Sequence, residues 1–188
     1  MKGYTIWAVV AGCVLAACAT PAVLEYRWRQ NLLPLGVQAP VITYAGEVVW
    51  GWGPGGDETG LIVYRMDRAS AERVQAGGIA WLENEATRSV APLRRPAMDR
   101  RMRRTYSDWR MTPLAELWAG HGEHNCGQEP GLGVYLDYAD FRCRVDPEEI
   151  ARANRLLLTP GSFVARARGG RVVIVAPAER LVIVAYNG

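Results

Sequence analysis

The chain has 188 residues, of which 49% are hydrophobic, and a formal net charge of +3. That length suffices for one domain with its own core, and a near-balance of 22 basic and 19 acidic residues gives no bulk attraction to nucleic acid. Lys2 is the only lysine, which excludes a Walker A phosphate loop and Schiff-base or pyridoxal phosphate chemistry, because all of these need a lysine amine.

The N-terminal residues have the composition of a secretory signal. The α-amine and Lys2 are positively charged, residues 4–14 are uncharged and mostly apolar, and small residues follow. The run Leu15-Ala16-Ala17-Cys18 resembles the lipobox of bacterial lipoprotein precursors. The resemblance implies that residues 1–18 hold a signal peptide cut just before Cys18, whose thiol carries fatty acids such as palmitate. Ala19, where the family's inner-membrane proteins have Asp, implies the outer membrane of the cell envelope, facing the periplasm.

An uncleaved membrane helix is the alternative for the same segment. Residues 4–24 carry no charge, and about 20 apolar residues can cross a bilayer. The following Tyr26-Arg27-Trp28-Arg29 would then anchor the helix at the membrane surface. This alternative places the chain in the inner membrane.

Behind the signal, residues 19–40 hold three prolines and mixed polarity, which predicts a tether. Residues 41–188 are expected to form a single α+β domain. We expect an antiparallel sheet of about five or six strands with three or four short helices and a C-terminal three-stranded meander, preceded by an N-terminal apolar helix.

The first half of the domain begins with a predicted hairpin. Strands are expected over residues 44–52 and 61–66, because apolar and polar side chains alternate on either side of a glycine-rich turn. Asp67 or Ser70 can cap a helix that runs to about Ala76, where Gly77 and Gly78 stop it. A second short helix or buried turn is expected to reach residue 86.

An arginine-rich segment follows. Asp99 can cap a helix on which Met98, Met102, Tyr106 and Trp109 form an apolar stripe flanked by guanidinium groups. Such a basic amphipathic helix suits an anionic membrane or an acidic partner, whereas a solvated loop with methionines in the core is the alternative. A partner surface is therefore expected along this segment or near the glycine loop, at Arg94, Arg95, Arg100, Arg101, Arg103, Arg104, Trp50 and Trp52.

Residues 112–119 are predicted to form a short helix, with Thr112 as its cap and Pro113 at its first position. His121, His124 and Cys126 then stand close together and offer a metal site or, with Glu123, a Cys/His-dependent hydrolase site. In an oxidising envelope, however, Cys126 and Cys143 are expected to form a disulfide bond. A bonded cysteine cannot act as a thiolate, so no metal and no cofactor is expected in that case.

The C-terminal third shows the clearest local signals. A strand is predicted over residues 133–138. Asp146 caps a predicted helix that starts at Pro147 and ends near Leu157. Strands over residues 162–168, 171–176 and 181–186 form the meander, the first two joined by a two-residue glycine turn.

These observations favour a membrane-anchored envelope lipoprotein with a non-catalytic binding or structural role. The expected partners are the membrane, through the lipid, and a protein of the envelope; nucleic acid is not expected. Two alternatives remain open from the sequence. One is a hydrolase built on the loop from His121 to Cys126, and the other is a lipoprotein that confers immunity to a toxin.

Overall fold

The structure is a computed structural model that describes residues 21–50, 57–88, 106–114, 131–136, 141–167 and 170–187. It divides into two compact units, residues 1–32 and residues 33–188. Each unit is described by itself below. The predicted signal sequence and the arginine-rich segment lie outside the described residues.

In the smaller unit, residues 21–30 are helical. They lie within residues 19–40, for which the sequence predicts a tether. An ion pair between Arg29 and Glu25 links successive turns. The chain then turns, as the amide of Leu32 donates to the carbonyl of Arg29 over 3.0 Å. Among the described residues, no helix is both long and apolar enough to span a bilayer.

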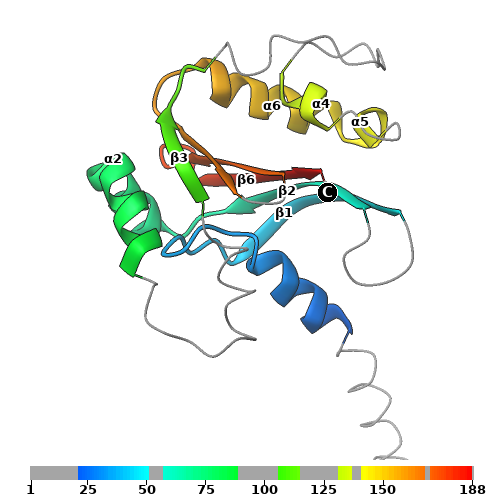
Figure 1. The fold of residues 1–188 in the computed structure, drawn as a ribbon, viewed down its shortest axis with the longest axis horizontal. Coiled ribbons are helices and arrows are strands. Elements are labelled where there is room, and N and C mark those ends of the chain that lie inside the picture. Colours follow the sequence, from blue (N-terminus) through cyan, green and yellow to red (C-terminus); the bar gives the residue numbers. More distant parts are fainter. Residues whose placement is uncertain are drawn as a thin grey trace, which may run out of the picture. The chain divides into compact units, whose positions relative to one another are not determined.

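The larger unit contains one antiparallel sheet of six strands in the order β1-β2-β6-β5-β4-β3 (Figure 1). Long apolar runs place β5 and β6 at its centre, where both faces are covered. The α+β class and the C-terminal meander of β4, β5 and β6 are thus confirmed. The strands are β1 (Val41–Trp50), β2 (Asp57–Arg65), β3 (Tyr106–Met111), β4 (Phe163–Ala167), β5 (Arg171–Ala176) and β6 (Leu181–Asn187).

Three helices cover one face of this sheet: α4 (Leu132–Tyr135), α5 (Phe141–Arg144) and α6 (Pro147–Leu158) (Figure 1). The helix α6 begins as predicted, because the Asp146 carboxylate accepts from the amide of Glu148 over 2.9 Å and Pro147 occupies the first turn. Its apolar residues Ile150, Ala153, Leu156 and Leu157 are buried in the core. The core on this face includes Leu61, Val63, Leu132, Leu136, Phe141, Ile150, Ala153, Leu156, Leu157, Ile174 and Ile183.

The opposite face of the sheet is buried as well, so the domain has a second core. Alternate residues of the same strands point there, and α2 (Arg68–Arg88) contributes the buried Ala71, Val74 and Leu82. Gly78 of α2 lies against the ring of Phe163 on β4. The buried strand residues of this face are Ile62, Tyr64, Val173, Val175, Val182 and Val184.

The helix α2 confirms the predicted interruption at the glycine pair. The carboxylate of Asp67 accepts from the amide of Ser70 over 2.6 Å at its start, as an N-cap does. Gly78 then has φ +53° and ψ −142°, and the chain continues helically beyond this kink. A glycine tolerates that positive φ without steric cost.

The predicted helix through Tyr106 and Trp109 is wrong where the structure describes it. These residues lie on the edge strand β3, paired with β4. The register shifts between Ser107 and Arg110, and Asp108 has φ +57°, so the strand carries a bulge. The extra residue places Tyr106 and Trp109 on the same buried face at a spacing of three, which is also a helical spacing.

The predicted cap at Thr112 is also wrong. Residues 112–114 are not helical, because their backbone pairs with distant segments: the amide of Thr112 donates to Ser162 and that of Leu114 to Leu157. The Thr112 hydroxyl is buried and donates to the carbonyl of Thr159 over 2.6 Å. It therefore ties β3 to the start of β4 and caps no helix.

The predicted strand over residues 133–138 is wrong as well where the structure describes it, over residues 133–136. Residues 132–135 form the one-turn helix α4. Leu132 and Leu136, spaced by four residues, are both fully buried, and the amide of Leu132 donates to the side-chain oxygen of Asn154 on α6 over 2.9 Å. Packing against α6 thus overrides a sequence with strand-like alternation.

Candidate functional site

Most residues singled out in the sequence lie outside the described residues. This holds for Cys18, Trp52, the six arginines from Arg94 to Arg104, His121, Glu123, His124 and Cys126. Trp50 is the last residue of β1. The partner surface, the metal or hydrolase loop and the lipidated cysteine therefore stay predictions.

One cysteine of the expected disulfide bond lies in the described part. Cys143 is on the single turn α5 and its side chain is exposed, while its neighbour Arg142 is buried. The bond to Cys126 stays a prediction, because that residue is not described. The exposure of Cys143 makes the prediction easy to test with a thiol reagent.

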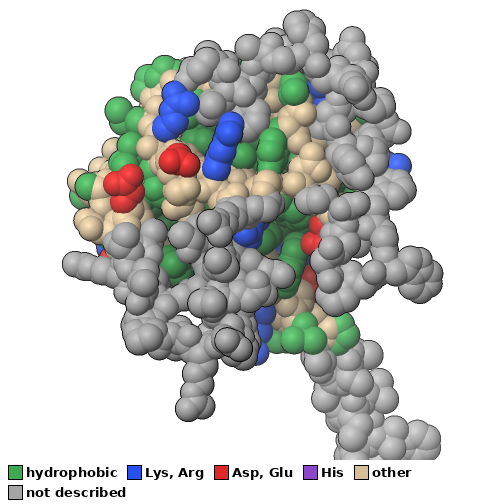
Figure 2. All heavy atoms as spheres, viewed as in Figure 1, with side chains coloured by type: hydrophobic (Ala, Val, Ile, Leu, Met, Phe, Trp, Pro, Cys, Tyr) green, Lys and Arg blue, Asp and Glu red, His purple; other side chains and the backbone are tan. Residues whose placement is uncertain are grey.

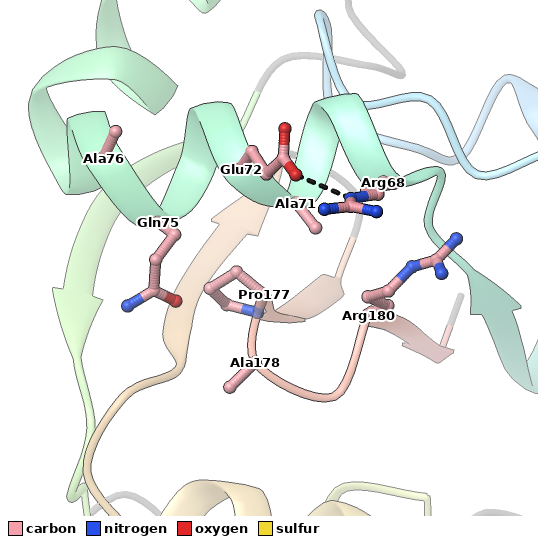
Figure 3. Close-up of a pocket in the computed structure, with 8 residues that line it drawn as sticks. All are labelled: Arg68, Ala71, Glu72, Gln75, Ala76, Pro177, Ala178 and Arg180. Carbon is pink, nitrogen blue, oxygen red and sulfur yellow. Dashed lines mark hydrogen bonds and ion pairs between the residues drawn. The ribbon is translucent and has the colours of Figure 1, made fainter.

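The described residues form a surface groove of about 560 Å³ between the first half of α2 and the turn that joins β5 to β6 (Figure 3). Figure 3 shows the ring of Pro177 on the side of the turn that faces the helix. The helix contributes Arg68, Ala71, Glu72, Gln75 and Ala76, and the turn contributes Pro177, Ala178 and Arg180. The groove is thus apolar in its middle and polar along its rim.

The turn is held in place by Arg180. Its backbone has φ +55°, a left-handed conformation that a non-glycine residue rarely adopts. Its guanidinium group donates to the carbonyl of Met66 from Nε and Nη2 over 3.2 and 3.1 Å, and the Met66 amide donates to the carbonyl of Arg180 over 2.8 Å. These contacts fix the turn against the end of β2 and so shape one wall of the groove.

The charges along the groove are exposed and partly paired. Arg68 and Glu72 form an ion pair of 2.8 Å, which raises the pKa of the Arg68 guanidinium through its hydrogen bond with Glu72. Figure 3 places Arg68 and Arg180 at the same end of the groove, with Gln75 toward the other. Elsewhere on the described surface that faces the viewer in Figure 2, basic and acidic side chains lie side by side.

This arrangement places apolar and charged groups side by side. Among the described residues, the lining holds no cysteine, histidine, serine or threonine, and its one carboxylate, Glu72, is paired with Arg68. Across the described part of the chain, no three His, Cys, Asp or Glu side chains cluster in a way that could hold a metal ion. An apolar floor with guanidinium groups at one end can hold a ligand that carries an apolar group and an anionic one.

A second polar feature lies on the sheet face that carries the second core. The hydroxyl of Tyr186 on β6 donates to the carboxylate of Glu47 on β1. Burial raises the pKa of Tyr186 well above its ordinary value, and the charges of Glu47 and Glu58 raise it further. Tyr186 therefore stays protonated and acts as a hydrogen-bond donor.

Sequence reasoning did not find the groove. Its two walls are more than 100 positions apart in the chain, and each residue is ordinary for its own helix or turn. The only local signal is the turn sequence between β5 and β6, and that signal indicates a connection, not a ligand site. Comparison with protein-family models, with curated proteins and with solved structures finds no match for this chain.

Proposed function

We propose that this chain is a membrane-anchored lipoprotein of the bacterial cell envelope whose domain has a non-catalytic binding role. The observation that carries the proposal is the run Leu15-Ala16-Ala17-Cys18 at the end of an apolar segment that follows Lys2. A plain membrane helix gives no role to a cysteine at that position. Several acyl chains on one cysteine would anchor the chain stably, whereas a single chain binds only marginally.

The binding role is supported by the kind of surface that the domain offers. The groove between α2 and the β5–β6 turn combines an apolar floor with Arg68 and Arg180 at one end, and the one carboxylate among its described lining residues, Glu72, is paired with Arg68. The arginine-rich segment adds a second basic region in the sequence. Both features suit a ligand or partner that presents acidic and apolar groups together.

The proposal is tested by lipid labelling in a bacterial host. Cells that express the full chain are grown with a radiolabelled or clickable palmitate, and the protein is recovered from the membrane fraction. The variant C18S should carry no label and keep its signal sequence, because the acylated thiol is gone. The variant C13S is the matched control, since it removes the other cysteine of the same segment, and it should be labelled like the wild type. Equal labelling of C18S, or no label on the wild type, would contradict the proposal.

A further inference from the structure

The helix over residues 21–30 exposes an unusual group of apolar side chains. Val23, Leu24 and Tyr26 are 47%, 60% and 43% exposed within a stretch of four residues. The other exposed large hydrophobic side chains of the described part, Val41, Met111 and Leu158, are far apart in the sequence. Scattered apolar residues need no explanation, but a cluster on one short helix indicates a surface that something covers.

The position of this helix in the chain says what can cover it, and this step rests on the proposed function. If Cys18 carries the acyl chains, only Ala19 and Thr20 separate it from Pro21, the first residue of the helix that the structure describes. Three residue steps span at most about 10 Å. The acyl chains of Cys18 therefore keep Pro21 within about 10 Å of the membrane surface. Interfacial helices bury their apolar face to a similar depth, about 5–10 Å into the boundary between headgroups and acyl chains.

The charges of the helix suit the same environment. Glu25 is engaged by Arg29 in an ion pair, so its negative charge is neutralised beside a bilayer that contains anionic lipids. Arg27 is exposed, and its long side chain can reach a lipid phosphate while the apolar side chains stay deeper. Tyr26 has the amphipathic ring that is enriched at the membrane–water interface.

We propose that helix 21–30 lies in the interfacial layer of the phospholipid bilayer that holds the acyl chains of Cys18, with Val23, Leu24 and Tyr26 turned into it. The chain is then attached twice, covalently through the lipid and non-covalently through the helix. The occupant of the exposed apolar surface is the bilayer and not a second copy of the chain.

The test is hydrogen exchange on the full acylated protein in vesicles of phosphatidylethanolamine and phosphatidylglycerol. The wild type is compared with the double variant V23D/L24D and with the control L158D, which introduces the same charge at an exposed leucine of α6. Pro21 stands two residues before Val23 and suits the first turn of a helix, where aspartate favours helix formation, so the double variant should stay helical. Intact mass of each sample establishes its N-terminus and its acyl groups.

We expect the amides of residues 25–30 to exchange about tenfold more slowly in the wild type and in L158D than in V23D/L24D. The reason is that burying one leucine-sized side chain shifts a binding equilibrium by at least about tenfold. Equal exchange in all three acylated proteins would overturn the inference and leave the lipid anchor standing. Protection that grows with protein density on the vesicle would assign the surface to a second copy and overturn it too. A mass that starts at Met1 without fatty acid would overturn the proposed function itself.

Discussion

Tyr186 and Glu47 are joined by a hydrogen bond although a whole strand lies between them. The intervening residue of β2 is Gly60, which pairs with Glu47 on one side and with Tyr186 on the other. A Cβ atom at Gly60 would collide with the Tyr186 ring. The glycine thus lets the tyrosine cross the strand and bind the edge strand β1 to the centre of the sheet.

The variant G60A should therefore destabilise the domain. We expect a loss of about 1–3 kcal/mol in the free energy of unfolding, because the added methyl group overpacks a filled site. Urea denaturation measures it. In a Y186A background the added methyl group no longer meets the ring, so the cost of G60A should fall there. An equal cost in both backgrounds would show that the ring does not cause the effect.

The domain should lose stability at alkaline pH through two tyrosines. Burial raises the pKa of Tyr135 from 10.0 to about 12, and Tyr186 is shifted in the same direction. A raised pKa means that the folded state holds the proton more tightly, so this stability is present below pH 10 and declines as the pH rises further. Tyrosinate absorbance should show a component near pH 12 that disappears in Y135F. Full ionisation of every tyrosine near pH 10 in the folded protein would contradict this assignment.

The buried hydroxyl of Thr112 should contribute more to the free energy of unfolding than its methyl group does. It donates to the carbonyl of Thr159 over 2.6 Å and accepts from the amide of Ser162 over 3.0 Å. The variant T112V keeps the shape but leaves that buried amide without its partner, which costs about 1–3 kcal/mol. T112S keeps the hydroxyl and should lose less than T112V in thermal or urea unfolding. A smaller loss in T112V than in T112S would show that packing dominates.

The expected disulfide bond predicts the thiol content of the exported protein. If Cys126 and Cys143 are bonded and Cys18 is acylated, a thiol reagent should find no free cysteine until a reductant is added. Cys143 is exposed, so a reduced thiol there would react readily. Breaking the bond should destabilise the domain by about 3 kcal/mol in the chain-entropy model. Two free thiols together with bound zinc would instead favour the hydrolase alternative at His121 and His124.

The elements that the sequence predicted well are those with local signals. The helix α6 has an aspartate cap, a proline in its first turn and acids at its positive end, and none of these depends on the rest of the fold. The glycine pair in α2 interrupts the helix wherever the helix packs. The strands β5 and β6 are apolar on both faces, which only a central strand can bury.

The elements that it missed depend on tertiary structure. The bulge at Asp108 places the two buried residues Tyr106 and Trp109 three positions apart, so the hydrophobic pattern of this edge strand has the spacing of a helix. The turn α4 exists because Asn154 and the core of α6 hold Leu132 in place. The groove needs two segments that meet only in the folded chain, so no local pattern could indicate it.

The intact mass of the protein purified from membranes is the most direct measurement of the central proposal. The lipoprotein assignment predicts a mature chain that begins at Cys18 and carries a diacylglyceryl group. After digestion, the peptide that begins at Cys18 should partition into organic solvent because it carries the acyl chains. A chain that begins at Met1 and bears no fatty acid would contradict it.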